Sequence, residues 1–267
     1  ALALLGNIYL DSDKIQAQPQ RGVEYLKRAN RLGHPYATAR LGEAYLKGEG
    51  MPADPVQGVA LLTDAANQKQ SGAARTLGIA YMDGTGLQRD PAKAQRWLNL
   101  AVEQDPTDTT SKTRLGQGYL EGKLPGASHQ GVKLLEEAAD QGDAYAMVVL
   151  GRAYREGVGV SPNLNRSELW LQRAERAGHP SARQALARTY RASGEQGNID
   201  DLIRAANMGE VPAMADLGRA YLRGQGVRAS YASARQWLTK AADAGHPGAT
   251  ASLGQMYAEG LGVGVNK

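Results

Sequence analysis

The sequence predicts an all-α, right-handed solenoid of stacked helical hairpins, and three observations lead to this prediction. The motif L-G-x-x-Y occurs eight times with one variation, and successive motif tyrosines lie 36, 36, 38, 35, 36, 31 and 36 residues apart. A second motif, as in WLTKAAD at 237–243, follows each of the first seven tyrosines. Glycine-rich segments connect the two motifs. Each unit therefore consists of a helix A, a glycine loop, a helix B and a tight turn.

Helix A carries the first motif. Its Leu and Tyr are four residues apart and share one face of a helix. The Gly beside the Leu has no Cβ, so another helix can come close at that point. Because glycine costs about 1 kcal/mol in a helix interior, its retention in seven of eight units predicts tight packing there. The motif lies at 5–9, 41–45, 77–81, 115–119, 150–154, 186–190, 217–221 and 253–257.

Helix B carries the second motif, and we expect its bulky first residue, like the motif tyrosines, to lie in the core. An Asp or Ser before Pro, at 54–55, 90–91 and 161–162, predicts the N-cap and first residue of helix B. The chain thus predicts about seven helix pairs plus one extra helix in a single repeat domain over 1–267. Since it opens inside one helix A and stops after another, we expect a piece of a longer chain. The bulky positions are Tyr25, Leu61, Trp97, Trp170 and Trp237.

The tripeptide Gly-His-Pro marks the turn after helix B, at 33–35, 178–180 and 245–247. Its Gly is expected to end helix B in the left-handed conformation, and its Pro to begin the next helix A. Equivalent turns carry an acidic residue in place of His, and the three histidines are separated by several repeats. We therefore interpret them as structural, with no shared metal ion, and expect His129 to be solvated in a loop.

Composition argues against most chemical functions. There is no cysteine, so disulfides and thiolate sites are excluded. No Ser/His/Asp set or phosphate-binding loop can be assembled, and we expect neither catalysis nor a cofactor or metal. The net charge of +4 permits an anionic partner. No Lys/Arg run indicates nucleic acid, and no apolar stretch approaches the ~18 residues of a membrane span.

One surface pattern stands out. If the motif tyrosine is buried, the residue two positions earlier points about 160° away from it. Arginine holds that position in three consecutive units, and further arginines flank it. We predict an arginine stripe on the concave face that binds an acidic partner. The alternative is that these are ordinary solvated arginines, with Glu156 and Asp216 neutralising part of the charge. The stripe comprises Arg152, Arg155, Arg188, Arg191, Arg219 and Arg223.

The paired motifs, seen best at 213–227 and 234–247, resemble the Sel1-like repeat family, a relative of tetratricopeptide repeats. The resemblance implies a scaffold that binds protein partners. Bacterial members such as the alginate-export lipoprotein AlgK imply envelope assembly or exopolysaccharide secretion, in the periplasm or at the outer membrane; the cytoplasm is the alternative. Direct binding of an anionic polysaccharide is a second possibility, and an enzyme is disfavoured. The chain lacks the cysteines of disulfide-rich members, and its sixth unit has Ala187 in place of Gly and a shorter loop.

Overall fold

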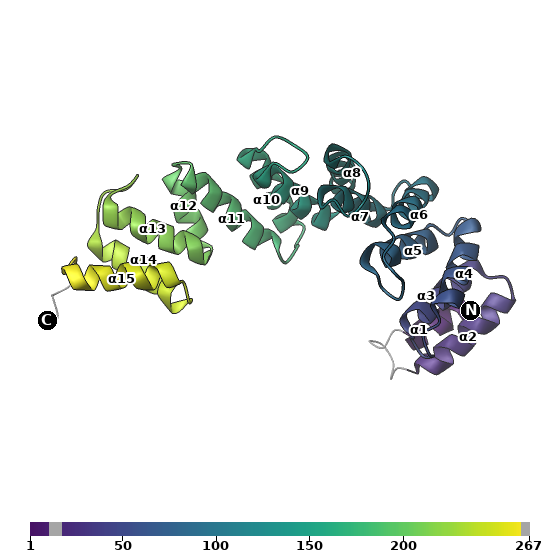
Figure 1. The fold of residues 1–267 in the computed structure, drawn as a ribbon. Coiled ribbons are helices and arrows are strands. Elements are labelled where there is room, and N and C mark those ends of the chain that lie inside the picture. Colours follow the sequence, from purple (N-terminus) through teal and green to yellow (C-terminus); the bar gives the residue numbers. More distant parts are fainter. Residues whose placement is uncertain (11–17, 263–267) are drawn as a thin grey trace. The chain divides into compact units, whose positions relative to one another are not determined.

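The computed structural model describes residues 1–10 and 18–262, which fold into fifteen α-helices without a β-strand (Figure 1). This confirms the predicted all-α repeat fold. The A helices are α1 (Leu2–Leu10), α3 (Pro35–Lys47), α5 (Ser71–Asp83), α7 (Thr109–Leu120), α9 (Ala144–Glu156), α11 (Ala182–Glu195), α13 (Val211–Arg223) and α15 (Pro247–Glu259). The B helices are α2 (Pro19–Arg31), α4 (Pro55–Asn67), α6 (Pro91–Gln104), α8 (Ser128–Asp140), α10 (Leu164–Arg176), α12 (Ile199–Asn207) and α14 (Tyr231–Asp243).

The helices form two compact units, Ala1–Asp143 with α1 to α8 and Ala144–Lys267 with α9 to α15. Within each unit, consecutive helices pack against one another. A helices also contact the A helix of the next repeat, as α1 does with α3, α3 with α5, α9 with α11, and α13 with α15. The expectations of one continuous domain and of a longer parent chain stay predictions.

The glycine of the first motif is where helix A meets helix B. In six repeats, a Cβ added to this glycine would lie within 2.8 Å of a side-chain carbon of the B-helix leucine. Those leucines and the motif leucines of α3, α5, α7, α9, α11 and α13 form the most deeply buried layer; Leu77, Leu98 and Leu238 have no exposed surface. The close approach therefore explains why the sequence accepts the helical cost of glycine. The pairs are Gly6 with Leu26, Gly42 with Leu62, Gly78 with Leu98, Gly116 with Leu135, Gly151 with Leu171, and Gly218 with Leu238.

The aromatic residues of the motifs are less buried than expected. Tyr119, Tyr154 and Tyr190 are buried, whereas Tyr257 is 52% exposed. The bulky first residues of the B motif are only half-buried, and the leucine after each one fills the core instead. Trp170 and Trp237 lie at the rim, where cations stack on their rings: Arg173 lies 4.4 Å and Lys240 4.3 Å from the respective ring centroids.

The predicted starts of helix B are right in two of three cases. Asp54 accepts hydrogen bonds from the N–H groups of Val56 and Gln57, and Asp90 accepts one from Lys93. The pair at 161–162 is not the cap, because helix α10 begins two residues later and Asn163 accepts from the Arg166 N–H at 2.9 Å. The cap residue lies nine positions after the motif tyrosine and donates its own N–H to the tyrosine carbonyl, over 2.9 Å for Asp54 and 2.7 Å for Asn163.

The Gly-His-Pro turns have the expected structural role. Gly33, Gly178 and Gly245 have φ of 71°, 78° and 84°, the left-handed conformation that ends a helix. His246 caps α15, since its Nδ1 accepts from the Ala249 N–H at 3.1 Å. The prediction that the Pro begins helix A fails at 180, because α11 begins at Ala182.

The sixth repeat differs from the others. Helix α12 has nine residues, while the other B helices have 13 or 14, and it starts later relative to its core leucine. The close glycine contact moves from position 187 to Gly194, whose added Cβ would lie 2.7 Å from Leu202. The shift of seven residues, two helical turns, keeps that contact on the same face of α11.

Candidate functional site

Neighbouring A helices of the first unit are joined by a regular set of polar contacts. Position numbers count from the motif tyrosine, so Asn7 and Glu43 are at Tyr−2. Arg40, at Tyr−5 of α3, donates from Nε to Asn7 at 2.8 Å and also pairs with Glu43. Thr76, at Tyr−5 of α5, donates to Glu43 at 2.8 Å. At these two junctions the Tyr−2 position of one helix thus faces the Tyr−5 position of the next and has polar partners; the Tyr−2 position of α5 holds the apolar Ile79 instead.

Two of the six predicted arginines serve the same contact in the second unit. Arg155, at Tyr+1 of α9, pairs with Glu156 at 2.6 Å and donates to the Ala185 carbonyl of α11 at 3.5 Å; its side chain is only 14% exposed. Arg191, at Tyr+1 of α11, reaches Asp216 on α13 at 3.1 Å. Both arginines therefore connect repeats, a role that the sequence pattern did not predict.

Asp216 is the carboxylate around which this contact is built. It pairs with Arg191 from α11 and with Arg219 from its own helix. Burial, the largest single influence, lowers the pKa of Arg191, but the hydrogen bond to Asp216 and the charges of Glu195 and Asp216 outweigh it and leave that pKa raised. Arg191 is thus ionised, and it is held in ion pairs with Asp216 and Glu195 within the protein.

Arg152 and Arg188 are different. Both occupy the Tyr−2 position, on α9 and α11, and both side chains are exposed with no hydrogen-bond or ion-pair partner among the described residues. The reason is the register between Tyr−2 and Tyr−5 of contacting A helices. In that register Arg152 corresponds to Ala185, which has no polar side chain, and Arg188 corresponds to Asp216, which pairs with Arg191 and Arg219 instead.

Arg223, the sixth predicted residue, is exposed near the end of α13. It lines a hollow of about 330 Å³ together with Glu195, Asp216 and Arg219, so opposite charges balance there. Arg152, Arg188 and Arg223 have no hydrogen-bond or ion-pair partner among the described residues, and of these three Arg152 and Arg188 share the Tyr−2 position on contacting A helices. We call this pair the free-arginine line.

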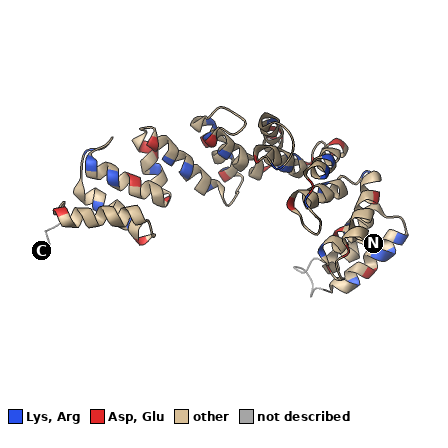
Figure 2. Ribbon diagram, in the orientation of Figure 1, with Lys and Arg blue, Asp and Glu red and all other residues tan. Residues whose placement is uncertain are grey.

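Charge is unevenly divided between the two units. Residues 1–143 hold 16 Lys and Arg against 17 Asp and Glu, whereas residues 144–267 hold 15 against 10. Figure 2 shows basic segments along α11 and α13 of the second unit. The net positive charge of the chain therefore belongs to the unit that carries the free-arginine line.

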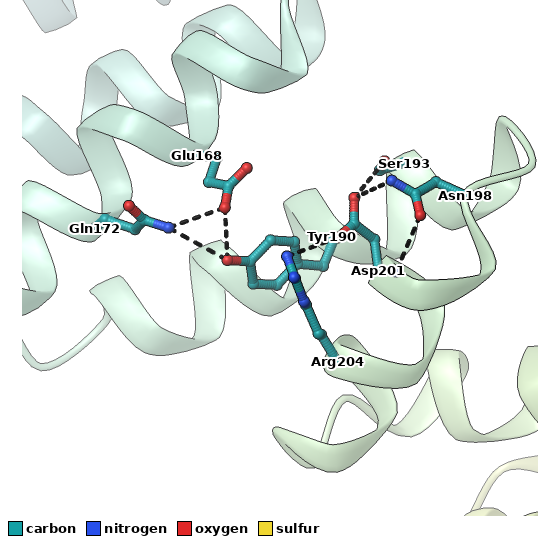
Figure 3. A network of polar contacts seen from close by, with 7 residues as sticks. All are labelled: Glu168, Gln172, Tyr190, Ser193, Asn198, Asp201 and Arg204. Carbon is teal, nitrogen blue, oxygen red and sulfur yellow. Dashed lines mark hydrogen bonds and ion pairs between the residues drawn. The ribbon is translucent and has the colours of Figure 1, made fainter.

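A polar network fixes helix α11 next to this line (Figure 3). The Tyr190 hydroxyl donates to Glu168 of α10 at 2.8 Å. The Arg204 guanidinium lies over the Tyr190 ring at 5.6 Å and pairs with Asp201 at 3.2 Å. Burial raises the pKa of Tyr190, and the Glu168 carboxylate adds to this effect, so the phenol stays protonated and can donate.

The same network closes the shortened loop of the sixth repeat. Asp201 accepts from Ser193 and from the Asn198 amide, each at 2.7 Å (Figure 3). Asn198 in turn caps α12 by accepting from the Asp201 N–H. The short spacing of the sixth tyrosine indicates a departure at this point, but the partners of these side chains cannot be read from it.

The described residues contain no group of three or more His, Asp or Glu placed to hold a metal ion. Among them, no helix combines the length and apolarity that crossing a bilayer requires.

Comparisons with known proteins agree with the fold. The Sel1 repeat model matches residues 1–34, 35–69, 71–106, 111–143, 144–179, 211–246 and 247–267. The unmatched segment between 179 and 211 is the sixth repeat, with its short helix α12. None of the curated proteins matches the chain at a significant level.

Among solved structures, a Sel1 repeat protein of Oxalobacter formigenes is 28% identical and has a TM-score of 0.65; the match covers 100% of this chain and 79% of that one. A protective antigen of uropathogenic Escherichia coli is 22% identical over 99% of this chain and 73% of that one, at a TM-score of 0.40. Since the family model matches seven segments that together span most of the sequence, this chain belongs to the Sel1 repeat family.

Proposed function

We propose that the chain is a scaffold whose second unit binds an acidic segment of a protein partner along the free-arginine line. Sel1 repeat proteins are generally non-catalytic and mediate protein–protein interactions. The observation that carries the proposal is the pair Arg152 and Arg188. They hold equivalent positions on contacting A helices, are exposed, and have no hydrogen-bond or ion-pair partner among the described residues.

Arginine at such a position favours carboxylates. Its guanidinium can donate two parallel hydrogen bonds to one carboxylate, and the flanking ion pairs of Arg155 and Arg191 hold the supporting helices in place. Both arginines lie within regular α-helices, so little backbone ordering is required when a partner binds. Because exposed charges are screened by salt, binding should weaken as ionic strength rises.

The test uses the full chain and a fluorescein-labelled peptide, Glu-Glu-Ser-Glu-Glu, which we call the serine peptide. Fluorescence anisotropy measures the affinity of this peptide for the chain. We expect the double variant Arg152→Glu/Arg188→Glu to bind this peptide at least about tenfold more weakly. The matched control is Arg176→Glu/Arg235→Glu, which changes the net charge equally on exposed arginines of the B helices α10 and α14.

If both double variants weaken binding equally, the effect is long-range charge and the proposed site is wrong. Far-UV circular dichroism verifies that each variant keeps its helices. An oligogalacturonate of similar charge serves as the carbohydrate comparator. Binding of that comparator as tightly as the peptide would overturn the choice of a protein partner.

The cellular setting stays a prediction. A place in bacterial envelope assembly or exopolysaccharide secretion, in the periplasm or at the outer membrane, rests on the family resemblance. The bacterial source of the similar Oxalobacter structure agrees with a bacterial setting. Fractionation of the native host followed by immunodetection would test the compartment, and recovery with the cytosolic fraction would contradict it.

A further inference from the structure

A groove lies directly beside the free-arginine line in the second unit. It has a volume of about 580 Å³ and runs between the first half of α11 and the turn from α12 to α13. Arg188 itself lines it. Its other principal lining residues are Arg183, Ala187, Met208, Val211 and Pro212.

The groove combines an apolar floor with basic walls. Ala187 is buried beneath it, and Met208, Val211 and Pro212 are half-buried along its side. Arg183 and Arg188 are exposed and have no polar partner among the described residues. The acid that lines the groove, Glu210, is already engaged, because its carboxylate caps α13 by accepting from the Ala213 N–H at 2.7 Å.

In the preceding repeat, an aromatic stack occupies the equivalent position. There Tyr145, at Tyr−9 of α9, stacks on His179 in the next turn with ring centroids 5.8 Å apart. The equivalent residues one repeat later are Ser181 and Glu210, so neither ring is present. The groove is thus a position that lacks the internal aromatic stack of the preceding repeat, and two free arginines lie beside the space.

We propose that this groove is the specificity pocket of the free-arginine line and takes an aromatic side chain flanked by carboxylates from an acidic segment of a protein partner. This inference rests on the proposed function. The aromatic ring would replace the missing stack above Ala187 and Met208. The guanidinium groups of Arg183 and Arg188 can stack on a ring and pair with the neighbouring carboxylates at once.

The experiment compares two labelled peptides on the full chain, the serine peptide and its counterpart Glu-Glu-Phe-Glu-Glu, called the phenylalanine peptide. The charge is the same, so only the side chain for the groove differs. We expect the phenylalanine peptide to bind at least about tenfold more tightly than the serine peptide, since a buried aromatic ring adds apolar contact area.

A groove-filling variant makes the test specific. Gln184 is exposed and lines the groove. The substitution Gln184→Trp places an aromatic ring of the protein's own there. We expect this variant to bind both peptides with the affinity of the serine peptide for the unaltered chain. Gln236→Trp, at an exposed position on α14, is the matched control and should keep the preference.

The outcomes separate the two proposals. Equal binding of both peptides by the unaltered chain, still lost in Arg152→Glu/Arg188→Glu, overturns the pocket and leaves the arginine line standing. Binding of neither peptide overturns both. A preference that survives in Gln184→Trp, with unchanged helicity, places the aromatic side chain elsewhere and also overturns the pocket.

Discussion

At the scale of single residues, the second unit distinguishes arginines that hold the fold from arginines that are free to bind. Arg155 and Arg191 look equivalent to Arg152 and Arg188 in the sequence, yet only the former two reach the neighbouring A helix. The difference is three residues, a little less than one helical turn, between Tyr−2 and Tyr+1. A residue at Tyr+1 lies beside the A helix of the next repeat. Whether a residue at Tyr−2 finds a polar partner depends on which side chain occupies Tyr−5 of that helix.

Asp216 offers the most direct test at this scale. It pairs with both Arg191 and Arg219. The substitution Asp216→Asn keeps the shape but removes the charge, so Arg219 loses its ion pair and Arg191 retains only its ion pair with Glu195. Positive charge thereby becomes available to an acidic ligand. We expect the serine peptide to bind about threefold to tenfold more tightly at low ionic strength, measured by anisotropy. Because the Asp216 side chain is 25% exposed, the stability cost should stay below about 1 kcal/mol.

The control for this variant is Asp64→Asn, which alters an exposed carboxylate of α4 in the first unit by the same charge. A similar gain in affinity from both variants would assign the effect to net charge. No gain from Asp216→Asn would mean that Arg191 and Arg219 stay inaccessible, and Asp216 would then not be the group that withholds them from a ligand.

At the scale of helices, much of the fold can be predicted from the sequence because the same helix-capping and turn residues recur in most repeats. The alternation of A and B helices, the caps at Asp54 and Asp90 and the left-handed glycines all result from interactions within a few residues. The cap at Asn163 was missed because Ser-Pro is a good local signal. The decisive contact is the bond from its N–H to the Tyr154 carbonyl.

The candidate site was less predictable for the same physical reason. The exposure of Arg152 and Arg188 follows from helical periodicity within one helix. The pairing of Arg191 with Asp216 depends on how two A helices are staggered, and the groove depends on side chains missing from two different repeats. Neither is encoded in a local pattern. A comparison of the Tyr−9 and turn positions between repeats would have shown that the Tyr145–His179 pair has no equivalent at the next junction.

The motif glycine supplies a prediction about helix packing, with a control inside the same chain. An added Cβ at Gly78 would lie 2.6 Å from Leu98, whereas at Gly254 it would have no neighbour within 4 Å among the described atoms outside its own helical turn. Gly78→Ala should lower the free energy of unfolding by about 1–3 kcal/mol through overpacking. Gly254→Ala should raise it by up to about 1 kcal/mol through helix propensity.

Urea unfolding followed by far-UV circular dichroism measures both glycine variants. Close packing at Gly78 and open space at Gly254 require changes of opposite sign in the free energy of unfolding. A stabilising effect of Gly78→Ala would show that Leu98 can move aside, and the glycine would then need another explanation.

At the scale of the whole chain, the two units differ in charge although they share one repeat architecture. The first unit is nearly neutral and fills its Tyr−2 positions with residues such as Asn7 and Glu43, which neighbours satisfy. The second carries the excess of arginine and the sixth repeat that the family model does not match. We infer that the repeats of the first unit serve packing, while the departures of the second unit serve binding.

Chemical labelling of the complete chain tests this division. Phenylglyoxal modifies accessible arginines, and Arg152 and Arg188 should react readily, as should Arg28, Arg31 and Arg96 of the first unit, because all five are exposed. Arg155, whose side chain is 14% exposed and ion-paired, should react slowly. With saturating phenylalanine peptide, peptide mapping by mass spectrometry should show protection of Arg152 and Arg188 alone among the exposed five. Protection spread evenly over both units would mean that an acidic ligand responds to charge density anywhere on the chain, and the functional division between the units would fail.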